Sequence, residues 1–222
     1  MNKLIIPEDW SFNSNNVAEN FNSHVKEQLP WYGLVTSAVA HIARHYIPKN
    51  GLVYDVGASS GNIGRVLKQT LDNREASLIA IENSNEMAQT YNAPGILEIT
   101  DAANYDYQPF DLCICFLTLM FVEPSSRSKL INNLKRNIKE GGALIIVDKC
   151  EPSGGYPSII LTRLALQQKL ENGVEASEIV AKELSLSGIQ RPLNKKHLEG
   201  ATEFFRFGDF AGWIIEAEYE RT

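Results

Sequence analysis

The chain of 222 residues is long enough for one large α/β domain with a sizeable core. A hydrophobic content of 44% with 22% charged residues is ordinary for a globular protein. The net charge of −6 lacks the excess of Lys and Arg that nucleic-acid binding normally requires, so the composition disfavours a nucleic-acid partner.

The first residues and the cysteines indicate in which cellular compartment the protein is expected. The apolar run 4–6 is too short, and the residues after it too acidic, for a signal peptide. No apolar run approaches the roughly 18 residues that a membrane helix requires. The three cysteines lie in or beside apolar strand runs and cannot all pair: Cys113, Cys115 and Cys150. We therefore expect reduced thiols in a cytoplasmic protein that makes no membrane contact.

The first 47 residues are expected to form a helical lead-in, or lid, to the domain that follows. Residues 1–30 are polar and rich in asparagine, with a short helix predicted over 17–28. Apolar side chains then recur at helical spacing over 31–47, and Pro48 ends that helix.

Strands and helices alternate through the middle of the chain. The strand runs are short and apolar, as strands covered on both faces should be. Because helix-length segments separate them, we expect right-handed crossovers and a mostly parallel sheet. The predicted strands span 52–56, 77–81, 96–99, 110–116 and 143–149, and the predicted helices between them span 62–71, 85–91 and 125–139.

After the fifth predicted strand the pattern changes. A long helical stretch over 156–187 is interrupted at residues 172–173, and 202–207 and 211–219 are predicted to close the sheet as an antiparallel hairpin. The sequence therefore predicts a doubly wound, mostly parallel seven-stranded α/β sheet with a C-terminal antiparallel hairpin. This order of elements resembles the class I methyltransferase arrangement, and we expect residues 1–222 to form a single domain.

The segment 52–64 is the most informative part of the chain, a buried strand that runs into a glycine-rich turn and a helix. Asp55 stands just before the first glycine, Gly57, whose backbone can take positive φ and approach a ligand closely. Gly61 and Gly64 allow the turn and close packing of the helix on the sheet. The position of the turn and the preceding acid favour S-adenosylmethionine over a dinucleotide.

Acidic residues also follow the next two predicted strands. Glu82 ends the second strand, where ribose hydroxyls need an acceptor, and Asp101 follows the third, where a polar residue usually addresses the adenine amino group. Asp55 and the turn amides could hold the ammonium-bearing aminopropionate. Three features in this order predict an adenosyl cofactor site. The alternative is that these residues serve only turns and helix caps.

The glycine turn also resembles the nucleotide turn of short-chain dehydrogenases. Those proteins place the turn near the amino terminus and need a later Tyr-x-x-x-Lys pair. No tyrosine of this chain has a lysine four residues later, so that interpretation fails.

Further segments make the chain similar to the carboxy-S-adenosylmethionine synthases, methyltransferase-fold proteins that act in modifying the wobble uridine of transfer RNA. The resemblance covers nearly the whole chain, and the Thr-Leu-x-Phe-x-Glu-Pro-Ser run at 118–125 is its most specific part. The matching segments are 10–12, 17–21, 30–32, 53–57, 79–84, 118–125, 141–144 and 207–208.

The resemblance implies a set of cofactor contacts, a lead-in that folds over the cofactor, and a homodimer. The family usually has Asp where Glu82 stands, a change that a ribose contact tolerates. The implied contact residues are Tyr32, Gly57, Ala58, Ser59, Glu82, Asn83, Asp101 and Ala102.

Two positions depart from the family. Phe116 stands where the family has an asparagine, and Glu183 stands where it has the arginine that binds the carboxylate of the carboxymethyl group. A glutamate repels a carboxylate. We therefore predict an S-adenosylmethionine-dependent methyltransferase acting on a small or unknown acceptor. Two alternatives stay open: a divergent carboxy-S-adenosylmethionine synthase and a non-catalytic cofactor-binding subunit.

Methyl transfer depends on alignment and exclusion of water more than on a base, so no catalytic residue is predicted. Acceptor contacts are predicted at Trp31, His24 and Tyr156, with packing or surface roles as the alternative for each. His41 and His45 are four residues apart on one helix, but surface or packing roles are favoured, and no metal site is predicted.

Overall fold

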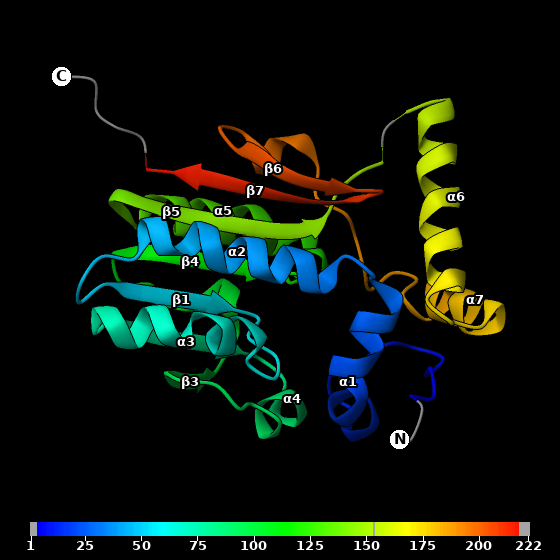
Figure 1. The fold of residues 1–222 in the computed structure, drawn as a ribbon, viewed down its shortest axis with the longest axis horizontal. Helices are drawn as coiled ribbons and strands as arrows, with labels where there is room; N and C mark the ends of the chain where they lie inside the picture. The colour runs from blue at the N-terminus through cyan, green and yellow to red at the C-terminus, as the bar shows by residue number, and fades with distance from the viewer. Residues whose placement is uncertain (1–3, 153, 218–222) are drawn as a thin grey trace.

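Seven strands form one mixed sheet in the computed structural model, which describes residues 4–152 and 154–217 (Figure 1). The strand order is β3-β2-β1-β4-β5-β7-β6, with β1 to β5 parallel and β7 antiparallel to both β5 and β6. The strands are β1 (Leu52–Val56), β2 (Ser77–Glu82), β3 (Ile96–Ile99), β4 (Phe110–Phe116), β5 (Ile138–Lys149), β6 (Thr202–Phe207) and β7 (Phe210–Glu216). The predicted doubly wound sheet with its closing hairpin is confirmed.

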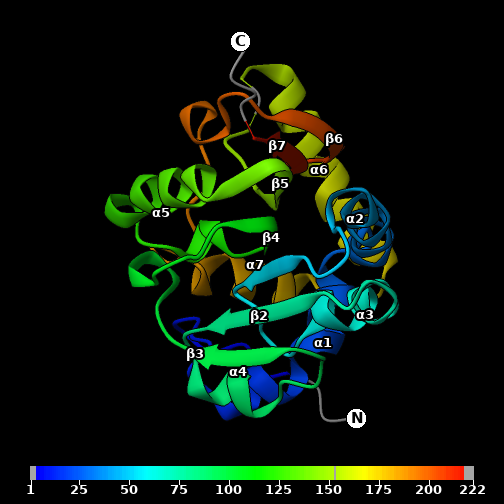
Figure 2. The ribbon, with the colours of Figure 1, turned by 90° about the vertical axis from the view of Figure 1, so that its left-hand side faces the viewer.

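Helices cover both faces of this sheet. Figure 2 shows α2 and α3 on one side and α5 on the other. The helices are α1 (Asn15–Gln28), α2 (Tyr32–Tyr46), α3 (Asn62–Arg74), α4 (Asn85–Gln89), α5 (Pro124–Arg136), α6 (Tyr156–Glu171) and α7 (Ala176–Ser185), with 3-10 turns η1 (Ala102–Asn104), η2 (Leu119–Phe121) and η3 (Lys195–Leu198). Within the described ranges, no helix is both long and apolar enough to cross a membrane.

Alternate residues of the central strands bury into two separate cores. On the α2 and α3 side, Ile114 and Ile145 pack in one cluster with Val39. On the α5 side, Cys113 and Leu130 belong to a second cluster. Because both faces are covered, β4 and residues 143–147 of β5 are almost wholly apolar, which is why the sequence shows them as continuous hydrophobic runs.

The predicted helix over 125–139 is wrong at its end. The helix stops at Arg136, and Ile138 already belongs to β5, where it pairs with Phe110. The sequence prediction took the two glycines at 141–142 as the helix stop. Gly142 instead serves close strand packing, since a Cβ there would lie 2.6 Å from the Asp111 carbonyl oxygen.

The long C-terminal helical stretch divides where it was predicted to divide. α6 ends at Glu171, and Gly173, at φ +86°, turns the chain into α7. The predicted last strand, 211–219, corresponds to β7, which ends at Glu216; residues 218 and 219 lie outside the described part of the chain.

Candidate cofactor site

A cavity of about 320 Å³ opens at the carboxyl ends of the central parallel strands. It lies where the strand order changes direction between β1 and β4, the position at which doubly wound sheets bind ligands. Of the predicted cofactor residues, these line it: Tyr32, Asp55, Gly57, Ala58, Ser59, Glu82, Asn83, Asp101 and Ala102. The fold therefore gathers residues from four separate segments at one edge of the sheet.

The turn after β1 forms the floor of the cavity. Gly57 has φ +73°, and a Cβ there would lie 2.4 Å from the Thr118 side chain. Its N–H donates to the Ile81 carbonyl oxygen at 2.8 Å, which ties the turn to β2. Gly61 does not line the cavity. A Cβ at Gly61 would meet Ala93 at 2.5 Å, so this glycine lets the turn pack on the segment behind it.

Glu82 joins the ends of β1 and β2 through its carboxylate. One oxygen, Oε2, accepts the N–H of Ser59 at 2.8 Å, and Oε1 accepts the N–H groups of Asn83 at 3.0 Å and Ser84 at 2.9 Å. Such charge-assisted bonds hold a buried carboxylate in one orientation. The remaining lone pairs of Glu82 are therefore presented to the cavity in a fixed geometry.

Asp55 carries a buried carboxylate oxygen, Oδ2, without a hydrogen-bond partner among the described residues. Burial, followed by the charge of Glu82, raises the pKa of Asp55 to about 7, while a hydrogen bond from the Gly64 backbone opposes that rise. A buried oxygen without a donor is costly, so a cationic donor entering the cavity would be stabilised here.

The ends of β3 and β4 complete the rim. Asp101 caps η1, accepting the Ala103 N–H at 3.0 Å and the Asn104 amide at 2.7 Å. After β4, Leu117 takes φ +58°, and the Thr118 hydroxyl donates to the Val56 carbonyl oxygen at 2.8 Å.

The sequence analysis did not name Leu117 or Thr118 as site residues. Thr118 carried a signal, because it begins the specific segment at 118–125. No sequence feature pointed to Leu117, because a left-handed backbone conformation is normally expected at glycine or asparagine, and this position is a leucine.

The two N-terminal helices supply the opposite wall. Phe21 and Asn22 of α1 and Tyr32 of α2 line the cavity, and the Ser60 hydroxyl donates to Asn22 Oδ1 at 2.8 Å. The Tyr32 ring meets the Phe116 ring edge-on, with centroids 5.4 Å apart. Burial, with the charge of Asp55 second, raises the pKa of Tyr32 to about 12, so its phenol stays protonated at neutral pH.

The residues predicted to contact an acceptor do not line this cavity. Trp31 lies against Phe205 and Phe210, with ring centroids 5.3 and 5.2 Å away. His24 is buried beneath α7, and Tyr156, at the start of α6, is 65% exposed. Their predicted acceptor roles have no support in the position of these side chains.

The charged residues that line the cavity are all acidic. They are Asp55, Glu82, Asp101 and Glu123, and no Lys, Arg or His of the described ranges lines it. Glu183, which replaces the arginine of the family resemblance, lies on α7 outside the cavity and pairs with Lys169 at 3.1 Å. The electrostatics suit a ligand with positive charge and offer no partner to an additional carboxylate.

Residues 53–142 match a family described as a methyltransferase domain. A carboxy-S-adenosyl-L-methionine synthase from Staphylococcus epidermidis is 30% identical over 222 aligned positions, covering 94% of this chain and 97% of that protein. One from Shewanella pealeana is 26% identical and covers 93% of this chain and 88% of that protein. A magnesium protoporphyrin IX methyltransferase from Synechocystis, solved with bound SAH, superposes with a TM-score of 0.61 at 15% identity over 93% of this chain and 96% of its own.

The structural match shows the fold alone, whereas the identity to the Staphylococcus protein extends along nearly its full length. The cofactor of this fold, S-adenosylmethionine, agrees with the acidic cavity and its glycine turn. This chain therefore belongs to the carboxy-S-adenosyl-L-methionine synthase family, within the class I S-adenosylmethionine-dependent methyltransferase fold.

Proposed function

We propose that this protein binds S-adenosylmethionine in the cavity and transfers its methyl group to a small acceptor. The charge of the cavity carries this proposal: four carboxylates line it and no cation among the described residues does. A methyl sulfonium with its ammonium group brings positive charge that these carboxylates stabilise. A carboxymethyl sulfonium adds a carboxylate, which would face like charge.

Different residues of the cavity hold different parts of the cofactor. Asp55 Oδ2, which has no partner in the described chain, accepts a hydrogen bond from the ammonium. Glu82 accepts from the ribose hydroxyls with its free lone pairs, and the backbone at Gly57 and Ala58 allows close approach. Asn83, Asp101 and Ala102 border the adenine. When bound, S-adenosylmethionine supplies the electrophilic methyl group.

The protein then aligns the acceptor and excludes water. Phe116 and Tyr32 stand edge to face at the end of β4, and Phe12, Phe21 and Phe121 extend the apolar lining. A small acceptor with an apolar body fits such a lining, and orientation of this kind can account for much of the rate enhancement in methyl transfer. The net charge of −6 disfavours a nucleic-acid acceptor.

A second candidate function is synthesis of carboxy-S-adenosylmethionine. The name of the Staphylococcus relative, at 30% identity, favours it. Phe116 in the cavity and Glu183 outside it oppose it. A third candidate, a cofactor-binding subunit without catalysis, would share the same cavity.

Mass spectrometry of the cofactor that co-purifies with the protein separates the first two candidates. We expect S-adenosylmethionine or S-adenosylhomocysteine, and calorimetry should show binding of both. A carboxymethyl sulfonium in the protein would favour the second candidate, and failure to bind any of the three would refute an adenosyl site. A screen of small acceptors for S-adenosylhomocysteine release then tests for turnover, which a non-catalytic subunit lacks.

We also propose that residues 1–222 form one domain in which 1–47 act as a lid on the cavity. Three buried free cysteines support a reducing, cytoplasmic location. A homodimer is supported by α6, which has no buried residue and exposes Ile159, Ile160 and Leu170. Sedimentation velocity should give twice the chain mass of 24.8 kDa, and a single-chain mass would refute the dimer.

A further inference from the structure

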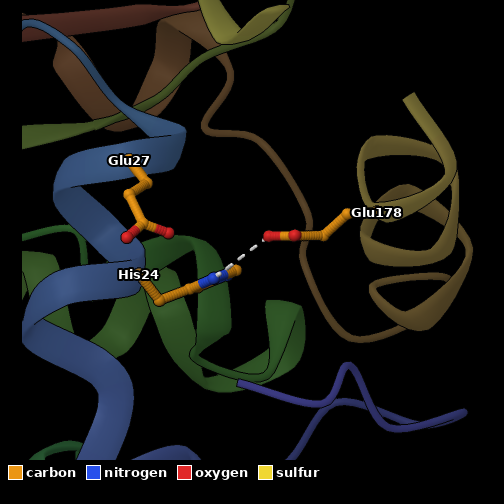
Figure 3. Close-up of side chains that lie close together, drawn as sticks. All are labelled: His24, Glu27 and Glu178. Atoms are coloured by element: carbon orange, nitrogen blue, oxygen red, sulfur yellow. Dashed lines mark ion pairs between the residues drawn. The ribbon is translucent and has the colours of Figure 1, made fainter. Parts of the chain in front are cut away.

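Away from the cofactor cavity, α1 and α7 bring one histidine and two glutamates together (Figure 3). His24 and Glu27 are three residues apart on α1 and therefore share a helix face. Glu178 extends toward them from α7, and its Oε1 lies 3.8 Å from His24 Nδ1. One ligand atom from each residue lies within 4.8 Å of the other two.

The histidine at this cluster is buried and incompletely paired. His24 is 4% exposed, its ring stacks on Trp10 with centroids 5.7 Å apart, and its Nε2 has no hydrogen-bond partner among the described residues. Burial, with the charge of Lys182 second, lowers the pKa of His24 to about 4. With the proton on Nε2, the neutral imidazole keeps the lone pair of Nδ1, the nitrogen that lies nearest Glu178, for a ligand.

The two glutamates differ in how they are held. The Glu178 side chain is 10% exposed, and Gln28 Nε2 donates to its Oε1 at 3.2 Å. This hydrogen bond holds the carboxylate in one orientation, as hydrogen bonds to metal ligands commonly do. Glu27 is exposed, so an ion can reach the cluster from solvent on that side.

Positive charge near the cluster is reduced. Lys169 pairs with Glu183 at 3.1 Å. Burial, followed by the charge of Lys169, lowers the pKa of Lys182, whose Nζ lies over the Trp10 ring. Glu183 therefore offsets part of the positive charge that Lys169 brings near the cluster.

We propose that His24, Glu27 and Glu178 bind a zinc ion, with water as the fourth ligand. Imidazole nitrogen and carboxylate oxygen are both ligands that Zn²⁺ accepts, at about 2.0–2.2 Å. Tetrahedral ligands at these lengths lie about 3.4 Å apart. The 3.8 Å between His24 Nδ1 and Glu178 Oε1, and the separations of up to 4.8 Å within the cluster, would close by side-chain movement when the ion binds.

The ion would join two parts of the chain that meet only in the folded protein. His24 and Glu178 are separated by 154 positions (178 minus 24), which explains why the sequence analysis predicted no metal site. Asn172 already donates to the carbonyl oxygens of Lys26, at 3.2 Å, and Glu27, at 2.8 Å. Because α1 also carries Phe21 and Asn22 of the cofactor cavity, the ion would steady one wall of that cavity.

Calorimetry of the full, untagged chain after removal of metals with a chelator tests the proposal, with ZnCl₂ as the probe. We expect one Zn²⁺ per chain. Glu27→Gln together with Glu178→Gln should weaken binding about tenfold or more, since both charged ligands are lost while the acceptor for Gln28 is kept. Zinc at about 100 times its Kd should raise the Tm of the wild type by about 5 °C, and that of the double variant much less.

Two controls separate this cluster from other zinc ligands. Glu19→Gln removes an exposed acid from the same helix and should leave binding unchanged. His41→Ala with His45→Ala removes the exposed histidine pair of α2, whose rings lie 5.5 Å apart, and should also leave it unchanged. The proposal is overturned if the wild type binds no zinc, if the double glutamate variant binds zinc as tightly as the wild type, or if only the variant at 41 and 45 loses it.

Discussion

Asp55 and Glu82 are neighbouring buried carboxyl groups in a cavity that no cation of the described chain lines. Burial and then the charge of Glu82 raise the pKa of Asp55 to about 7. Glu82 is held by three backbone N–H groups, whereas Asp55 Oδ2 has none. A cationic ligand would reduce the electrostatic repulsion between these two carboxyl groups, so the charge of the free site favours cofactor binding.

The first prediction concerns cofactor affinity and pH. Since a cationic ligand favours ionised Asp55, binding of S-adenosylmethionine should tighten from pH 6 to pH 8 and release a proton into the buffer. Asp55→Asn should weaken binding by about 10- to 100-fold and remove this pH dependence, because a charge-assisted bond is lost. Calorimetry in two buffers of different ionisation enthalpy measures both effects. Equal proton release by wild type and variant would contradict the assignment.

The second prediction concerns the stability of the ligand-free protein. The folded-state pKa of Asp55 lies above the unfolded value of 3.8, so the native state holds an extra proton between about pH 4 and 7. The stability that this proton gives is present below pH 3.8 and lost as pH rises through about 7. Asp55→Asn should therefore raise the free energy of unfolding by about 1–4 kcal/mol at pH 8 and by much less at pH 4. Urea titrations at the two pH values check this, and a variant less stable at pH 8 refutes it.

The third prediction separates backbone strain from steric clash at the turn. Gly57 and Gly141 have φ of +73° and +75°, but a Cβ meets Thr118 at 2.4 Å at Gly57 and nothing within 4 Å at Gly141. Gly141→Ala should cost about 1 kcal/mol for its conformation alone. Gly57→Ala should cost about 1–3 kcal/mol more and also weaken cofactor binding, since Thr118 or the turn must move. Urea denaturation compares the two variants, and equal costs would contradict the clash.

The fourth prediction addresses Tyr32. Tyr32 lines the cavity, and Tyr32→Phe keeps its edge-on contact with Phe116 while removing only the hydroxyl. We expect cofactor affinity to fall about 2- to 10-fold, as for loss of one neutral hydrogen bond, with stability changed by less than about 0.5 kcal/mol. Calorimetry and thermal denaturation measure the two quantities. An unchanged affinity would place the Tyr32 hydroxyl outside the binding contacts.

The fifth prediction tests the acceptor role predicted for Trp31. The ring lies against Phe205 and Phe210 and is 6% exposed, so Trp31→Leu should lower the free energy of unfolding by about 2–4 kcal/mol. The Kd for S-adenosylmethionine should stay within about twofold of the wild-type value at a temperature where the variant is folded. A large loss of affinity with intact folding would instead support the role predicted from the sequence.

The sequence alone determined the order of the elements and the place of the site. Short apolar runs separated by helical periods implied a parallel sheet, and β1, β3 and β4 have the predicted bounds. Because parallel strands end at the same edge, the glycine turn, Glu82 and Asp101 could be expected to meet, although they are far apart in the chain. That inference needs only the local pattern of apolar residues and the order of the strands along the chain.

The tertiary structure decided where each side chain points. Trp31 and Tyr32 are adjacent in the sequence, yet one packs on β6 and β7 while the other lines the cavity, because neighbouring positions near the start of a helix face different directions. The end of α5 was decided by the pairing of Ile138 with Phe110. The approach of His24 to Glu178 depends on how α7 packs against α1. Contacts of this kind form between segments that are distant in the sequence, so the local spacing of apolar and polar residues does not predict them.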